Sequence, residues 1–139
     1  MAYLSRTTAK LLSGRDSVPG ACYFLTWCTH NRLPGLTAPA VQATLRLAIA
    51  NSGKSGDATL FAATIMPEHV HLLISLGKRL TVSQVVAKIK ATVTRQHPTV
   101  HWQLNFFEHR LRDHSVAEDF ALYIFMNPYV ANLISLDET

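Results

Sequence analysis

Residues 69 to 76 alternate between apolar and more polar positions, a period of two that is typical of a β-strand with one buried face. The positions on one side of this strand are all aliphatic: Val70, Leu72, Ile74 and Leu76. The other side begins with His69 and His71, which the same period places side by side. We expect the aliphatic side to pack against helices and the two imidazoles to lie about 7 Å apart on the opposite face of a sheet.

Similar patterns predict the other elements of the chain. We expect strands at 21–30, 58–65 and within 101–112, and helices at about 37–51, 81–97 and from 115 onward. The first strand is apolar on both sides, which predicts a central position in the sheet. The fourth strand carries several charges, which is typical of an edge strand or of a rim that faces the substrate. The link of residues 66–68 is so short that the second strand and the histidine strand must be antiparallel.

Three signals mark the expected helix ends. Thr81 and Gln84 form a capping box that opens the second helix, and Pro98 stops it. The pair Ser52-Gly53 is expected to close the first helix. The resulting order, βαββαβ followed by a terminal helix, predicts an α+β fold of the ferredoxin-like kind. In this sandwich, two helices cover one face of a four-stranded antiparallel sheet. We expect one domain over residues 1–139, with residues 1–20 as an irregular basic arm.

Composition narrows the class of protein. The chain is 48% hydrophobic and 16% charged, as in an ordinary globular domain. It has no apolar run near the roughly 20 residues of a membrane span and no apolar leader, so we expect a cytoplasmic protein without a membrane partner. Cys22 and Cys28 should lie roughly 20 Å apart on one strand, too far for a disulfide. The net charge of +4 suits a polyanionic partner such as nucleic acid.

Two pairs of residues carry candidate chemistry. The His69/His71 pair could bind one metal ion, although both histidines could equally sit on a wet sheet face. Tyr123 and Asn127 are four residues apart on the last expected helix and therefore share a face. Their plain alternative is a core tyrosine and an asparagine that ends a helix before a proline.

These residues also carry a resemblance to a known family. The matching blocks are residues 66–73 (MPEHVHLL), 102–103 (WQ), 107–112 (FEHRLR) and 123–128 (YIFMNP). They resemble the single-tyrosine HUH transposases of small bacterial insertion sequences, and most closely the REP-associated tyrosine transposase branch. The resemblance runs from about residue 23 to residue 134. It implies a ferredoxin-like fold, a divalent metal ion held by His69, His71 and Asn127, and Tyr123 as the nucleophile.

The implied reaction is cleavage and strand transfer of single-stranded DNA, at ends that form hairpins, through a 5′-phosphotyrosine. A phenol with a pKa near 10 is a weak nucleophile at neutral pH, so a metal ion that polarises the phosphate is chemically reasonable. Mg²⁺ or Mn²⁺ is expected, and zinc ranks lower. Tyr129 is a rival nucleophile by residue type, but it lacks a polar partner four residues later.

Two other functions remain open from the sequence. One is a ferredoxin-like module that binds single-stranded nucleic acid without catalysis. The other is a metal-dependent phosphohydrolase in which water replaces the tyrosine. The candidate DNA contacts are all basic: Lys78, Arg79, Lys88, Lys90, Arg110 and Arg112. Glu68 and His109 are expected near the site without a catalytic role, and both a monomer and a homodimer remain open.

Overall fold

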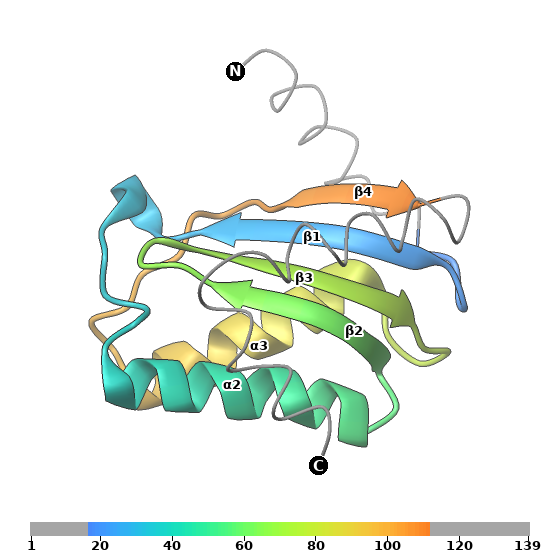
Figure 1. Cartoon of the computed structure of the whole chain (residues 1–139), viewed down its shortest axis with the longest axis horizontal. Helices are drawn as coiled ribbons and strands as arrows, with labels where there is room; N and C mark the ends of the chain where they lie inside the picture. The colour runs from blue at the N-terminus through green and yellow to red at the C-terminus, as the bar shows by residue number, and fades with distance from the viewer. Residues whose placement is uncertain (1–16, 112–139) are drawn as a thin grey trace.

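A computed structural model describes residues 17–111 of the chain, which contain a four-stranded sheet and two helices (Figure 1). The elements in chain order are β1 (Cys22–Cys28), η1 (His30–Arg32), α2 (Pro39–Lys54), β2 (Ala58–Ile65), β3 (His69–Leu76), α3 (Val82–Gln96) and β4 (Phe107–Leu111). The strand order is β2-β3-β1-β4, and each neighbouring pair is antiparallel. The predicted ferredoxin-like architecture is confirmed. The helix expected from residue 115 lies outside the described residues.

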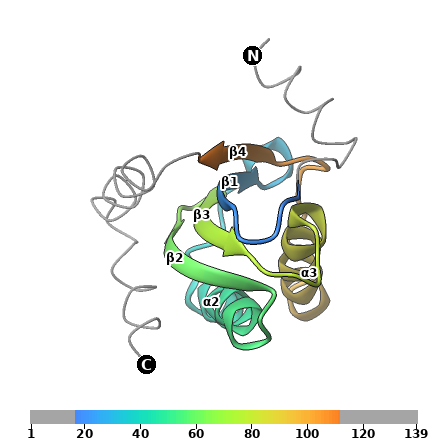
Figure 2. The same ribbon diagram turned by 90° about the vertical axis from the view of Figure 1, so that its right-hand side faces the viewer.

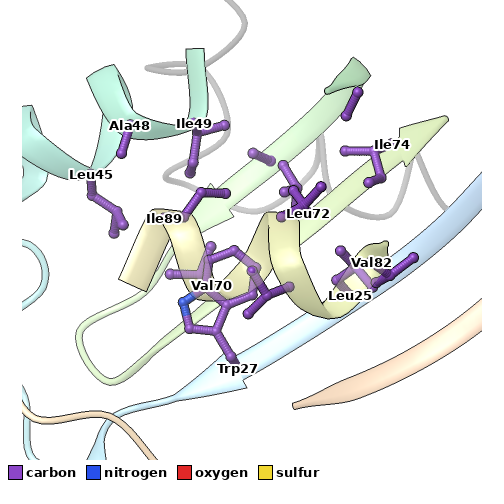
Figure 3. Packing of buried hydrophobic residues seen from close by; sticks show 14 of the residues in the cluster. Leu25, Trp27, Leu45, Ala48, Ile49, Val70, Leu72, Ile74, Val82 and Ile89 are labelled. Carbon is purple, nitrogen blue, oxygen red and sulfur yellow. The ribbon is translucent and has the colours of Figure 1, made fainter. Parts of the chain in front are cut away.

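Both helices cover the same face of the sheet, as Figures 1 and 2 show. The aliphatic side of β3 faces them, and its four predicted residues are at most 3% exposed. Trp27 and Leu25 of β1 meet Leu45 of α2 and Ile89 of α3 in this core (Figure 3). The sheet therefore separates a sealed apolar layer from a second face, which carries the histidines.

The central position predicted for the first strand is confirmed, because β1 pairs with β3 on one side and β4 on the other. The edge position of β4 is confirmed too, but its strand is shorter than the expected range and begins only at Phe107. Before that, Trp102 forms an isolated bridge with Thr29. The carbonyl of Gln103 then accepts a hydrogen bond from Lys90 Nζ at 2.9 Å. This contact joins the backbone before β4 to α3, while the Gln103 N–H still donates to the Cys28 carbonyl of β1 at 3.0 Å.

Ser52-Gly53, which was expected to close this helix, lies inside α2, because the helix continues to Lys54. The turn is made by Gly56, whose φ of +82° a glycine adopts without strain. The Gly56 N–H donates to the Gly53 carbonyl at 3.2 Å, and the Asp57 N–H donates to the Ser52 carbonyl at 3.0 Å. These two bonds form a Schellman motif, which satisfies carbonyls that the helix end would leave free.

The start of α3 agrees with the prediction. The Thr81 side chain accepts from the Gln84 N–H, and Gln84 Oε1 accepts from the Thr81 N–H, which completes the capping box. A further N–H at this end, that of Val82, donates to Ser17 Oγ at 2.8 Å. Ser17, which was expected to belong to the irregular basic arm, is thus bonded to the start of α3.

Two further expectations concern the described residues. Cys22 and Cys28 are free thiols, as their expected separation on one strand predicts. Within residues 17–111, no helix combines the length and the apolar character needed to cross a bilayer.

Candidate active site

The two histidines lie on the face of the sheet opposite the helices, as the alternation of β3 predicts. Their rings are closer than the strand repeat of about 7 Å, because the side chains lean towards each other. The ring centroids are 4.6 Å apart, and Nε2 of His69 lies 3.1 Å from Nε2 of His71. The two nitrogens that could bind one ion therefore converge.

The outer nitrogen of each ring has its own polar partner. His69 Nδ1 lies 2.7 Å from Glu68 Oε1, in the turn that leads into β3. His71 Nδ1 lies 2.7 Å from Thr26 Oγ1, on the neighbouring strand β1. Thr26 is directly opposite His71 in the antiparallel register, so both side chains project from the same face. Such outer contacts orient histidine ligands and select their tautomers.

Burial affects His71 strongly. Its ring stacks on Phe24, with centroids 5.4 Å apart and planes 20° apart. Burial, with a smaller contribution from the neighbouring His69, lowers the pKa of His71 to about 4. His71 is therefore a neutral imidazole at pH 7, which is the form that has a lone pair for a metal ion.

The nitrogen geometry fits a divalent cation. Two nitrogens about 2.1–2.2 Å from one ion, at roughly a right angle, would be about 3 Å apart, close to the observed 3.1 Å. Among residues 17–111, no third histidine, cysteine or acidic side chain joins the pair to complete a metal cluster. Cys28 lies opposite His69 in the register, but burial raises the pKa of its thiol, which disfavours the thiolate that binds metals. Asn127, the expected third ligand, and Tyr123 lie outside the described residues.

Two residues of this site were not singled out from the sequence. Thr26 is 45 positions from His71, and no local pattern reveals that they meet. Arg32 Nη2 lies 3.9 Å from Glu68 Oε1 and its side chain is 59% exposed, so its cation borders the histidine pair. Asn31 and Arg32 have φ values of 55° and 53°, which are uncommon for residues other than glycine. The sequence indicated only a break in the chain at this turn.

Two of the basic candidates, Arg79 and Lys88, bind the buried carboxylate of Asp57 instead of bordering the histidines. Asp57 directly precedes β2, where Ala58 pairs with Leu76 at the end of β3 remote from His69. The hydrogen bond from Lys88 is the main cause that lowers the pKa of Asp57 to about 2, assisted by Ser55 and Arg79 and opposed by burial. The sequence offered no sign of this ion-pair cluster.

The other basic candidates are dispersed. Lys90 is partly buried below Gln103, and burial lowers the pKa of its ammonium to about 8. Lys78 is exposed in the loop after β3, again at the end remote from His69. Arg110 lies opposite Tyr23, a core residue on the helix side of the sheet. Arg112 lies outside the described residues. Glu68 lies beside the histidine pair, as expected. The basic candidates described above do not. His109 shares the histidine face, because it lies opposite Phe24 in the register.

A family model supplies the context for this arrangement. The model described as "Transposase IS200 like" matches residues 17–115, which is most of the chain and includes the histidine strand. The chain belongs to the IS200-like transposase family. The resemblance inferred from the sequence blocks is thereby confirmed, and the function class is that of a transposase, a DNA-cutting enzyme.

Two solved structures share the fold of this chain. The IS200-like chain is similar to a REP-associated tyrosine transposase bound to a REP hairpin, with 26% identity and a TM-score of 0.69 over 82% of this chain and 70% of the other. It also shares its fold with a putative transposase from Deinococcus radiodurans R1, with 21% identity and a TM-score of 0.57 over 79% of this chain and 93% of the other. No curated protein matches the sequence significantly.

Proposed function

We propose that this IS200-like transposase cuts and rejoins single-stranded DNA in a metal-dependent reaction, through a covalent bond between Tyr123 and a 5′ phosphate. The observation that carries the proposal is the convergence of His69 Nε2 and His71 Nε2, 3.1 Å apart on the open face of the sheet. A protein that only bound DNA would have no need of two converging imidazoles whose outer nitrogens are held by polar partners.

The residues have distinct roles in this proposal. His69 and His71, with Asn127 as a third ligand, would hold a Mg²⁺ or Mn²⁺ ion. The bound ion would supply a positive charge that stabilises the negative charge developing on the scissile phosphate. The Tyr123 oxygen forms a bond to phosphorus while the bond from phosphorus to the 3′ oxygen breaks. The phenol proton is lost to solvent, and the departing oxygen takes a proton to become a free 3′-OH. Attack by a 3′-OH reverses these steps and releases Tyr123.

Hairpin-bearing single-stranded DNA is the substrate class that we propose. The similar REP-associated transposase is bound to a REP hairpin, and the family model covers most of this chain. The net charge of +4 favours a phosphate backbone, and the exposed Arg32 cation beside Glu68 is in position to meet a strand that approaches the histidines.

Trapping of the covalent adduct tests the proposal. Labelled single-stranded DNA from the flanks of the gene, incubated with Mn²⁺ and the full chain, should give a protein–DNA adduct on a denaturing gel. Tyr123→Phe removes only the hydroxyl, so the adduct should vanish while folding and DNA binding persist. Tyr129→Phe is the matched control and should leave the adduct intact.

The same gel separates the competing functions. Cleavage without an adduct would indicate water as the nucleophile, and binding without cleavage by the unaltered chain would indicate a module that only binds. An adduct that survives Tyr123→Phe would contradict the assignment of the nucleophile.

A further inference from the structure

The hydrogen bonds around the histidine pair form one continuous chain of four side chains. Thr26 Oγ1 lies 2.7 Å from His71 Nδ1, the two Nε2 atoms are 3.1 Å apart, and His69 Nδ1 lies 2.7 Å from Glu68 Oε1. Each imidazole has one partner at each nitrogen. The direction of each hydrogen bond therefore depends on that of its neighbour.

The carboxylate of Glu68 determines the direction of the chain. A carboxylate can only accept, so His69 Nδ1 must donate to Glu68 Oε1. At a mildly alkaline pH at which both rings are neutral, His69 Nε2 then carries no proton and acts as an acceptor. His71 Nε2, 3.1 Å away, must donate to it, because two lone pairs at that distance would repel each other. His71 Nδ1 is consequently bare and accepts the hydroxyl proton of Thr26.

This arrangement is incompatible with joint metal binding by the two Nε2 atoms. A metal ion needs a lone pair on each nitrogen, but His71 Nε2 carries a proton in the chain just described. The proton must leave Nε2, and Nδ1 must become protonated. Nδ1 then donates instead of accepting, so its partner has to change from a donor to an acceptor. A threonine hydroxyl can do both by rotating about its C–O bond.

We infer that Thr26 is a positioning residue whose hydroxyl lets the His71 proton move from Nε2 to Nδ1, converting the histidine pair from a mutual hydrogen bond into a joint metal ligand. The inference rests on the metal role of His69 and His71 in the proposed function. No proton is gained or lost by the ring, because one N–H bond breaks as the other forms. Glu68 holds His69 in the metal-binding tautomer throughout, so only His71 has to change.

The position of Thr26 suits this role. It lies on the central strand β1, directly opposite His71, and its register with β3 is continuous from Cys22 to Cys28. Phe24 of the same strand stacks on His71 and restricts rotation of the ring. Because the ring is held, its Nδ1 cannot readily find another partner when Thr26 is altered. An unpaired N–H in such a site costs more than an unpaired acceptor, so loss of the hydroxyl should disfavour the metal-binding tautomer.

Nitrogen NMR of the full chain tests the tautomers directly. Before metal is added, at mildly alkaline pH, ¹⁵N spectra of the imidazoles should show His71 protonated at Nε2 and His69 protonated at Nδ1. Addition of Mg²⁺, which is diamagnetic, should move the His71 proton to Nδ1. If His71 is already protonated at Nδ1 before addition, or if Mg²⁺ binds without moving the proton, the inference is overturned.

Variants of Thr26 test its part in metal binding. Thr26→Val keeps the shape of the side chain but removes the hydroxyl, and it should weaken Mn²⁺ binding, measured by electron paramagnetic resonance, roughly tenfold. Thr26→Ser should restore affinity to within about twofold of the original. Thr59→Val, the same change at an exposed position opposite Ser75, is the control and should have no effect.

The outcomes separate the inference from the proposed function. Unchanged Mn²⁺ affinity in Thr26→Val, with a normal fold by circular dichroism, would overturn the inference alone. Failure of the unaltered chain to bind Mn²⁺ or Mg²⁺ would overturn the metal role in the proposed function and this inference with it. The DNA adduct is measured separately.

Discussion

Glu68 connects the turn before β3 to the histidine pair, so its charge can act on the proposed metal site without binding the metal itself. Its carboxylate accepts from His69 Nδ1 at 2.7 Å, and Arg32 lies 3.9 Å away on its outer side. A carboxylate in this position increases the electron density of the ring and holds Nε2 towards His71. Glu68 is therefore expected to affect how strongly His69 binds a metal ion more than it affects the geometry of the site.

We expect Glu68→Gln to weaken Mn²⁺ binding about tenfold, at the lower end of what loss of an outer partner costs a metal site. The amide oxygen can still accept from His69, so the fold should be intact. The measurement is the Mn²⁺ concentration needed for half-maximal formation of the DNA adduct. Glu108→Gln is the control, because Glu108 lies opposite Leu25 on the helix side of the sheet. Equal effects of the two substitutions would contradict a specific role for Glu68.

Among the elements, the junction between α2 and β2 depends on Asp57. Its carboxylate is fully buried and is bonded by Lys88 from α3, by Arg79 from the loop after β3 and by Ser55 from the end of α2. One acidic side chain thus ties both helices to the end of the sheet that is remote from the histidines. Breaking such a buried pair leaves groups without partners, which is costly.

Asp57→Asn should lower the free energy of unfolding at pH 7, by roughly 1–3 kcal/mol. The pKa of Asp57 is lowered from 3.8 to about 2 in the folded chain, so ionisation favours folding at any pH above 3.8. That contribution is lost as the pH falls from about 4 towards 2. Urea unfolding of both proteins at pH 7 and pH 3 measures the effect, and the difference should narrow at pH 3. A difference that stays constant with pH would contradict the ion-pair explanation.

For the whole molecule, a count of the basic residues overstates the positive charge that the described part of the chain offers to DNA. Two of its cations, Arg79 and Lys88, are bound to Asp57, and Lys90 is partly buried under Gln103. Arg32 is the basic residue that the structure adds beside the histidine pair. Some of the basic residues counted in the sequence therefore stabilise the fold, and only the others are available to bind DNA.

DNA binding should nevertheless weaken as salt rises. With about four phosphate contacts to a single strand, affinity should fall roughly 50-fold between 50 and 200 mM salt. Fluorescence anisotropy with a labelled hairpin DNA measures this slope. Lys88→Gln should change stability and leave the slope nearly unaltered, whereas Arg32→Gln should reduce it. An affinity independent of salt would show that phosphate contacts do not drive binding.

The sequence by itself determined the elements and their faces. The period of two along β3 is local, so it placed His69 and His71 on one side and the aliphatic residues on the other. The capping box of α3 and the central position of the first strand could be predicted for the same reason, because each depends on residues a few positions apart. The sequence blocks also identified the family, which the match over residues 17–115 confirms. The roles of Tyr123 and Asn127 stay predictions, because both lie outside the described residues.

Only the tertiary structure decided which distant side chains meet. Thr26 and His71 are 45 positions apart, and Lys88 and Asp57 are 31 apart. The first contact depends on the register between two strands, and a shift of one residue would turn Thr26 to the other face. The second depends on how α3 packs beside the start of β2. Register and packing are properties of the whole folded chain, so no local pattern could show that Thr26 belongs to the histidine site or that Lys88 binds the buried Asp57.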